Sequence, residues 1–276
     1  MLNLPDVTLC AVTGTFLTQT LAAIGHARAC ARFGDILFVT DRPSDVPSRP
    51  DMRIVGVASL RSREEYSAVV QTGLDSYVTT PFVMLVQWDG YPVRPENWTD
   101  DFLSYDYLGA PWPQFPAPFS VGNGGFSLRS KRLLQACRDP RFQPFHPEDI
   151  GICHRNRALL EEDHGLRFAP VDLAARFSCE RMGSRSAAFG FHGVFNMPWV
   201  MGLDPFLDLF STLDWAQVGV RELLDVREVL RADGGPRARA EAGRLAREVL
   251  CRRWRDPALR SYVRRKLTRR ALQLPG

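Results

Sequence analysis

The fold is decided by the stretch Phe82-Val83-Met84-Leu85-Val86-Gln87-Trp88-Asp89-Gly90-Tyr91, a continuous apolar run that ends in one carboxylate and a glycine. Its length and its content of valine and phenylalanine are typical of a strand buried on both faces of a mainly parallel sheet. Asp89 then lies at the C-terminal end of that strand, where open α/β sheets bind their ligands. Asp-Gly is also a common turn signal, so a turn without a functional role explains the dipeptide equally well.

The residues before this stretch predict a β-α-β arrangement. Strands are expected at residues 7–12, 35–41 and 52–57, and helices at 17–33 and 62–73. Gly34 is expected to end the first helix, and Ser62 with Glu65 to form a capping box at the start of the second. Strands that alternate with helices in this way predict a doubly wound α/β sheet. The first loop, at residues 13–15, lacks the GxGxxG fingerprint of dinucleotide-binding proteins.

A glycine-rich segment, Val121-Gly122-Asn123-Gly124-Gly125-Phe126, comes shortly before Ser130. Three glycines permit unusual backbone dihedrals and the close approach of a ligand. A tight bend between a strand and a helix is the alternative, although a bend needs only one glycine. Ser130 is expected to cap a helix that runs from Lys131 to Arg138.

Two adjacent carboxylates, Glu148 and Asp149, open a helix that is predicted to run to about Glu162. Acidic residues in a first helical turn are favoured by the helix dipole, which is a sufficient reason for their presence. Alternatively, one of them points into a cleft as a general base.

Aromatic side chains gather in the loop at residues 97–113, where several prolines exclude a helix. Trp112 either stacks on a sugar ring or packs in the core, as large aromatic residues usually do. Later in the chain, short strands are predicted at residues 165–170 and 174–180, and His192 follows between glycines and aromatic residues. A lone histidine is usually packed or solvated, but one flanked by glycines can bind a metal through its neutral imidazole.

The composition is that of a soluble globular protein, with 276 residues of which 45% are hydrophobic and 24% charged. No apolar run is long enough to span a bilayer, and the N-terminus resembles no secretion leader, so we expect a cytoplasmic protein. The six cysteines have no CxxC or metal-binding spacing and are expected to be reduced and buried.

Charge is distributed unevenly along the chain. The net charge is +4, but residues 237–270 hold thirteen Arg or Lys and three acidic residues. Helices are predicted from residue 204 onward, at 205–213, 216–232, 237–255 and 257–272. The basic helices predict either a solvated face or contact with an anionic partner, which can be membrane lipid, nucleic acid or a polyanionic glycan.

Taken in order, five stretches resemble a bacterial family of glycosyltransferases encoded among surface-polysaccharide genes. The stretches are residues 87–90, 107–112, 121–130, 148–150 and 191–193. In layout the chain is similar to GT-A glycosyltransferases that invert the stereochemistry of the sugar. The resemblance covers about residues 7–196. It implies a GT-A-like α/β domain, which we place at residues 1–203, with a mostly parallel twisted sheet flanked by helices. The helices predicted from residue 204 onward lie outside the resemblance and form an α-helical extension over residues 204–276.

The resemblance implies roles for particular residues. Asp89 matches the last acid of an Asp-x-Asp motif that holds Mn²⁺ or Mg²⁺ on the donor diphosphate, and His192 would be a further ligand. Gln87 replaces the first acid of that motif and offers an oxygen without a charge. Either Glu148 or Asp149 would take the proton of the acceptor hydroxyl. The residues expected to contact the substrate are Thr13, Gln87, Trp88, Trp112, Asn123, Gly124 and Gly125.

These assignments predict a hexosyltransferase that moves a sugar from a nucleotide-sugar donor, a UDP-sugar being favoured, to a glycan, a lipid-linked acceptor or another hydroxyl. We expect it in the cytoplasm, with its basic tail against the anionic inner membrane. The alternative is a non-catalytic module that binds a nucleotide sugar or a glycan. Nucleic-acid binding is a third interpretation that rests on the basic tail alone.

Overall fold

The computed structural model describes residues 1–233, 235–252, 256–257 and 259–260. The chain divides into two compact units, Met1–His192 and Gly193–Gly276. The division falls before the boundary that we expected after residue 203.

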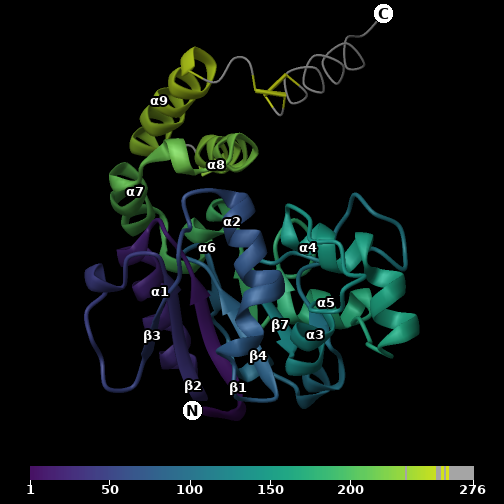
Figure 1. Cartoon of the computed structure of the whole chain (residues 1–276). Helices are drawn as coiled ribbons and strands as arrows, with labels where there is room; N and C mark the ends of the chain where they lie inside the picture. Colours follow the sequence, from purple (N-terminus) through teal and green to yellow (C-terminus); the bar gives the residue numbers. More distant parts are fainter. Residues whose placement is uncertain (234, 253–255, 258, 261–276) are drawn as a thin grey trace, which may run out of the picture. The chain divides into compact units, whose positions relative to one another are not determined.

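The first unit is built on a six-stranded sheet in the order β3-β2-β1-β4-β7-β6 (Figure 1). Its strands are β1 Leu2–Val12, β2 Ala31–Thr40, β3 Arg53–Gly56, β4 Phe82–Val86, β6 Tyr107–Leu108 and β7 Ser127–Ser130. β1 to β4 are parallel to one another, and β7 is antiparallel to both β4 and β6. The predicted α/β class with a mainly parallel sheet is therefore confirmed.

The order of the strands places a switch point beside β1. The chain moves outward from β1 to β2 and β3, then returns to the other side of β1 as β4. Ligands of open α/β sheets bind at such a point, outside the carboxyl ends of the strands. β4 is the apolar run of the sequence, and Val83 to Val86 are at most 1% exposed, as expected of a central strand.

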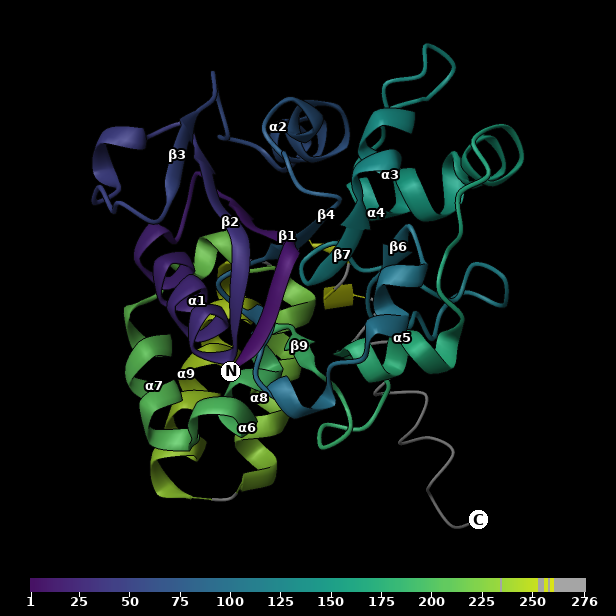
Figure 2. The same cartoon turned by 90° about the horizontal axis from the view of Figure 1, so that it is seen from below.

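Helices cover both faces of this sheet, as Figure 2 shows. They are α1 Leu17–Cys30, α2 Arg63–Ala68, α3 Lys131–Ala136, α4 Glu148–Ile150 and α5 Val171–Phe177. Val70 and Leu74, just after α2, and Leu134 of α3 pack on one face in a core cluster with β1, β2 and β4. Wider π-helical turns continue α2 over Val69–Gly73 and α4 over Gly151–Arg155, and another spans Leu159–Asp163. Short 3-10 turns occur at residues 43–45, 74–76, 95–97 and 100–104.

The first unit also contains a small second sheet, with the strand order β5-β9-β8. Its strands are β5 Gly90–Pro92, β8 Ser178–Cys179 and β9 Gly190–His192. β5 follows directly from the turn after β4 and pairs with β9 so that Gly90 lies opposite His192. This pairing brings His192, the last residue of the first unit, next to the turn that follows β4.

Three predictions of local structure are wrong. α1 ends at Cys30, and Gly34 lies inside β2 rather than after a helix. A Cβ on Gly34 would come within 1.9 Å of the carbonyl oxygen of Pro5, so close contact between β1 and β2 requires this glycine. The strand predicted at 174–180 is mostly the helix α5, whose alanines favour a helix, and only Ser178–Cys179 is a strand. The helix predicted from Glu148 is interrupted at Asn156.

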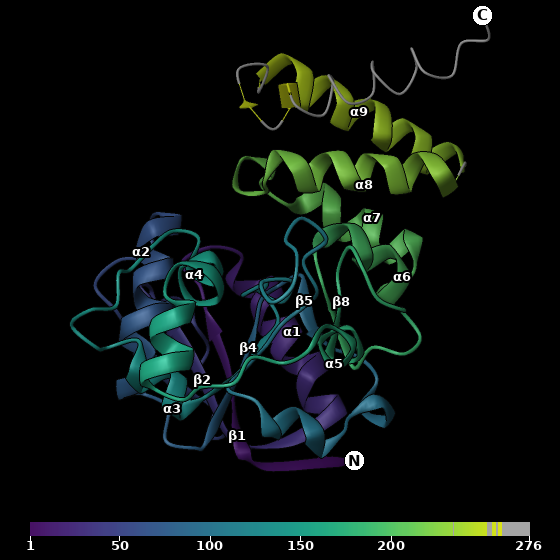
Figure 3. The ribbon, with the colours of Figure 1, turned by 90° about the vertical axis from the view of Figure 1, so that its right-hand side faces the viewer.

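The described part of the second unit is α-helical, as predicted from residue 204 onward. Its helices are α6 Met197–Met201, α7 Leu203–Thr212, α8 Val220–Asp233 and α9 Pro236–Arg252, with 3-10 turns at 194–196 and 215–217. α8 and α9 lie side by side in Figure 3 and bury Leu223, Leu230 and Leu245. The helix predicted at 257–272 and much of the basic segment lie outside the described residues. Among the helices that the structure describes, none is both long and apolar enough to cross a membrane.

Candidate active site

The C-terminal edge of the main sheet carries the first group of candidate residues. Asp89 follows β4 and is 6% exposed. Gln87 and Gly90 exchange backbone hydrogen bonds of 2.9 and 3.1 Å, which closes a tight turn around Trp88 and Asp89. The Asp-Gly dipeptide is thus a turn, and the same turn places a buried carboxylate at the end of the central strand.

Two aromatic rings meet at this edge. Trp88 lies 4.8 Å from Phe16, measured between ring centroids. Phe16 begins α1 and has a left-handed backbone with φ of 50°. Thr13, between β1 and Phe16, accepts a hydrogen bond from the backbone N–H of Thr15 and donates one to its carbonyl. The ends of β1 and β4 therefore carry a partly exposed aromatic pair.

Asp41 follows β2 at the same edge of the sheet. One of its oxygens accepts a hydrogen bond of 3.0 Å from the backbone N–H of Leu60. The other oxygen is buried and has no hydrogen bond to the described residues. It faces the loop after β1, because a Cβ on Gly14 would lie 3.0 Å from it.

The glycine loop, residues 122–125, is packed on two sides by the side chains of Glu148 and His192. A Cβ on Gly124 would lie 1.6 Å from Oε1 of Glu148, and one on Gly125 would lie 2.0 Å from Nε2 of His192. Asn123 has a positive φ of 66°, and its Oδ1 accepts a hydrogen bond from the N–H of Gly125. Glycine is therefore required at 124 and 125 because a carboxylate and an imidazole occupy the space of a side chain.

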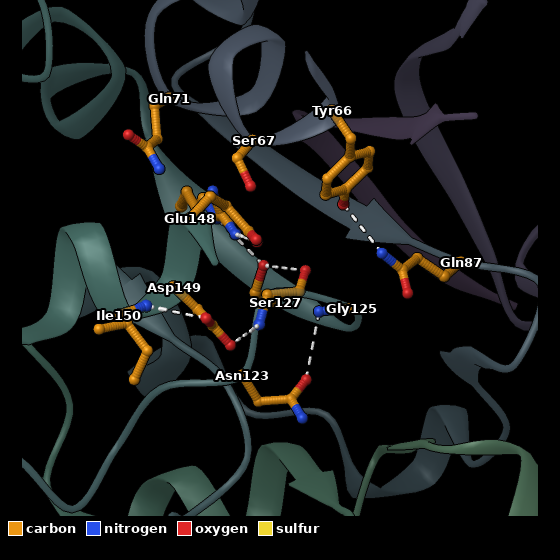
Figure 4. Close-up of polar contacts among 12 residues, drawn as sticks. Tyr66, Ser67, Gln71, Gln87, Asn123, Gly125, Ser127, Glu148, Asp149 and Ile150 are labelled. Atoms are coloured by element: carbon orange, nitrogen blue, oxygen red, sulfur yellow. Dashed lines mark hydrogen bonds and ion pairs between the residues drawn. The ribbon is translucent and has the colours of Figure 1, made fainter. Parts of the chain in front are cut away.

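Glu148 and Asp149, at the start of α4, have different partners (Figure 4). Glu148 is buried and forms an ion pair of 3.1 Å with Arg129, whose side chain is fully buried. Asp149 is partly buried and accepts hydrogen bonds from the backbone N–H groups of Gly124 and Ile150, at 3.2 and 2.8 Å. Burial and the neighbouring Glu148 carboxylate raise the pKa of Asp149 to about 7.

Two buried amide side chains hold the segment that leads into α4. Gln71 donates to the carbonyl of Phe145 at 2.5 Å and accepts from its N–H at 3.1 Å. Asn156 bonds both backbone groups of Gln143 in the same way, at 2.8 and 2.9 Å. Each amide forms two hydrogen bonds to the backbone of one residue, as a neighbouring strand would. These bonds fix the backbone that leads into Glu148 and Asp149.

His192 lies among several polar groups on the other side of the glycine loop. Its Nδ1 is 3.0 Å from the amide nitrogen of Asn123 and 3.8 Å from Glu180. Its Nε2 is 3.4 Å from Oε1 of Gln87 and 3.9 Å from Oδ1 of Asp89. The amide nitrogen of Gln87 donates to the hydroxyl of Tyr66 at 2.9 Å (Figure 4). This bond leaves the amide oxygen of Gln87 as the atom that faces His192.

These groups meet the needs of a divalent metal only in part. Within the described part of the chain, no three His, Cys, Asp or Glu side chains gather as a metal site. Nε2 of His192 nevertheless lies 3.4 Å from the amide oxygen of Gln87 and 3.9 Å from a carboxylate oxygen of Asp89. Mg²⁺ is commonly held by one or two carboxylates together with substrate phosphates. Asp89, His192 and Gln87 are therefore the residues that could contribute ligands to a divalent cation, whose remaining ligands would have to come from a bound molecule.

The structure brings most of the predicted site residues to this edge and loop. Asn123, Gly124 and Gly125 form the loop, with Glu148 and Asp149 on one side and His192 on the other. Trp112 packs against the first residue of the loop from the core side: it is 6% exposed in a core cluster with Leu133 and Ile152, and a Cβ on Gly122 would meet its ring at 2.2 Å. The structure thus gives Trp112 the core environment that was one of its two interpretations.

The sequence interpretation missed four residues that contact the site, namely Phe16, Asp41, Arg129 and Glu180. Arg129 could have been recognised from the sequence, because it is a charged residue that follows Leu128 in a buried strand. A buried charge needs a partner of opposite charge. The others become recognisable only through contacts between distant segments.

The chain belongs to the family described as "Protein of unknown function (DUF5672)", whose model matches residues 53–192. The matched range contains the turn after β4, the glycine loop, the carboxylate pair and His192. It excludes Thr13 and Phe16.

Two solved structures show a distant similarity to the chain. One is a glycosyltransferase involved in the glycosylation of the major capsid of PBCV-1, with 11% identity, a TM-score of 0.39, and coverage of 68% of this chain and 92% of its own. The other is the bifunctional IspDF from Campylobacter jejuni, with 8% identity, a TM-score of 0.36, and coverage of 55% and 46%. No curated protein matches the sequence significantly. Similarity at this level carries no argument about function.

Proposed function

We propose that this DUF5672 protein is a glycosyltransferase that moves a sugar from a nucleotide-sugar donor to a hydroxyl acceptor. One observation carries the proposal: the glycine loop has a carboxylate poised for proton transfer on one side and the group of Gln87, Asp89 and His192 on the other. Sugar transfer needs these two functions next to each other, one for the nucleophile and one for the leaving group.

The proposed reaction begins when Asp149 takes the proton of the acceptor hydroxyl. The acceptor oxygen then forms a bond to the anomeric carbon of the donor sugar. The bond between that carbon and the β-phosphate oxygen breaks, and its electron pair leaves with the nucleoside diphosphate. Attack opposite the leaving group inverts the configuration at the anomeric carbon.

Asp149 suits the role of base better than Glu148 does. Glu148 is held by the guanidinium of Arg129 and fills the space beside Gly124. The oxygens of Asp149 accept hydrogen bonds only from backbone N–H groups, among the contacts of the described residues. With a pKa of about 7, Asp149 exists at neutral pH in both the form that accepts a proton and the form that returns it.

The donor nucleotide would bind at the carboxyl ends of β1, β2 and β4. The ring pair of Phe16 and Trp88 offers a face on which a base can stack. The buried oxygen of Asp41 offers an acceptor for a ribose hydroxyl or a base N–H, as acidic residues do after the second strand of other nucleotide-binding sheets. We propose a UDP-sugar as donor and a glycan or glycolipid hydroxyl as acceptor.

Mn²⁺ or Mg²⁺ would be held by Asp89 and His192, with the amide oxygen of Gln87 as a weaker third ligand. A bound divalent cation would neutralise the charge that develops on the departing diphosphate. Because a second carboxylate is absent from the motif, we propose that the metal binds firmly only together with the donor.

Release of nucleoside diphosphate from a panel of UDP-, GDP- and dTDP-sugars tests this function. The wild-type protein should release one nucleoside diphosphate, faster with Mn²⁺ than with a chelator, and Asp89→Asn should lose the metal-dependent part. If a nucleotide sugar raises the melting temperature but is never cleaved with any acceptor supplied, the protein is a binding module and the proposal is wrong.

A further inference from the structure

Arg129 is an unusual residue for the middle of a sheet. Its side chain is fully buried on β7, and the ring of Tyr107 lies 5.2 Å from its Cζ. Nη2 donates to Glu148 at 3.1 Å, and Nε donates to the hydroxyl of Ser127 at 3.1 Å. Nη1 is buried without a hydrogen bond to the described residues. Burial of a guanidinium is costly, so a position of this kind needs a compensating role or partner.

A chain of hydrogen bonds connects Arg129 to the glycine loop. Ser127, which accepts from Nε of Arg129, donates to the carbonyl of Gly124 at 3.2 Å. The N–H of Gly124 donates to Oδ2 of Asp149. Glu148 closes the arrangement from the other side, because its Oε1 fills the space where a side chain on Gly124 would be. The peptide groups of Gly124 are therefore held at one end by the ion pair and at the other by Asp149.

The positive charge of Arg129 acts on both carboxylates, but only Glu148 forms a hydrogen bond with the guanidinium. Among the described residues, no cationic side chain makes a hydrogen bond to Asp149. Two other ionisable groups in the described part of the chain interact electrostatically with Asp149. They are Tyr107 from β6 and Cys153 from the turn after α4. Tyr66 from α2 interacts with Glu148 rather than with Asp149.

We propose that the buried Arg129–Glu148 pair is a positioning device for Asp149. It seats the glycine loop whose Gly124 N–H holds Asp149, and by engaging the guanidinium with Glu148 it leaves Asp149 able to exchange a proton. Glu148 and Arg129 are thus positioning residues, which act through Gly124 and through their charges. This inference rests on the proposed role of Asp149 as base, but its test needs no substrate.

The test is a pH titration of side-chain carboxyl groups by ¹³C NMR in the full-length protein labelled at aspartate. The wild type should show one carboxyl with a midpoint near pH 7, and Asp149→Asn should remove that signal. Glu148→Gln keeps the shape of the side chain but removes its charge, so the midpoint should fall by about one pH unit or more.

A second variant separates charge from shape. Arg129→Met alone would leave Glu148 unpaired in the interior, so it is made together with Glu148→Gln. Loss of both charges should return the midpoint of Asp149 toward that of the wild type, above the value in Glu148→Gln alone. Arg129→Lys, which keeps the charge, should stay near the wild type.

Equal midpoints in the wild type and Glu148→Gln would overturn the inference, as would a double variant that titrates no higher than Glu148→Gln. Either result leaves the proposed sugar transfer standing, because that function is judged by release of nucleoside diphosphate. Conversely, the protein can show the expected shifts in the Asp149 midpoint and yet release no nucleoside diphosphate. That result would support the positioning role of Arg129 and Glu148 and contradict the proposed transferase.

Discussion

Asp149→Asn should change the pH dependence of folding stability in a direction fixed by the raised pKa of Asp149. The carboxyl of an unfolded chain ionises near 3.8, whereas in the folded protein the pKa is about 7. Between these values the unfolded chain releases the proton and the folded protein keeps it. The free energy of unfolding of the wild type therefore falls as the pH rises through this window, and the loss is complete above pH 7.

The size of this effect follows from the two pKa values. One pKa unit corresponds to about 1.4 kcal/mol, so the shift sets an upper limit of about 4 kcal/mol. Roughly 2.5 kcal/mol of it falls between pH 5 and pH 8. The asparagine also loses one acceptor for the N–H of Gly124 or Ile150, at a cost of about 1 to 2 kcal/mol that does not depend on pH. Comparison of two pH values removes that constant cost.

Urea unfolding at pH 5 and pH 8 measures the effect. Relative to the wild type, Asp149→Asn should gain about 2.5 kcal/mol in unfolding free energy between pH 5 and pH 8. The exposed Asp172, in the first turn of α5, provides a matched control, because Asp172→Asn makes the same chemical change in solvent. If the wild type and Asp149→Asn differ by the same unfolding free energy at both pH values, the raised pKa of Asp149 is refuted.

Three further predictions concern the loop, its support and the edge of the sheet. Gly125→Ala should lower the melting temperature and abolish turnover, because its Cβ would lie 2.0 Å from His192; Gly243→Ala, with open space around it, should do neither. Gln71→Leu should cost about 2 to 4 kcal/mol in urea unfolding, because it leaves two buried backbone groups without partners. Trp88→Ala should raise the KM for the donor at least several-fold while kcat changes little, and an unchanged KM would remove the ring pair from the nucleotide site.

Local signals in the sequence predicted local structure well. β4 is recognisable because a central strand needs an unbroken apolar run, and the capping box of Ser62 and Glu65 is present as expected. Ser130 caps α3 by accepting a hydrogen bond from Leu133. The prediction that Gly34 ends a helix was wrong. In the sequence alone, a glycine that ends a helix cannot be distinguished from one that allows two strands to come into close contact.

The candidate site depended more on contacts between distant segments. The glycine loop was recognisable in the sequence. The need for glycine at 124 and 125 was not, because it comes from the packing of Glu148 and His192, which lie later in the chain. The sequence left open which of the adjacent carboxylates is the base, because the answer depends on Arg129 in another strand. Trp112 had two interpretations, and the contacts that place it in the core come from α3 and from the turn after α4.

The most direct test of the account compares wild type, Asp149→Asn and Glu148→Gln in acceptor-dependent release of nucleoside diphosphate at pH 7. If Asp149 is the base, Asp149→Asn should lose about 10²- to 10⁴-fold in kcat while it still binds the donor. Glu148→Gln should retain more activity than Asp149→Asn and have its acidic limb shifted to lower pH. Full activity in Asp149→Asn would contradict the account.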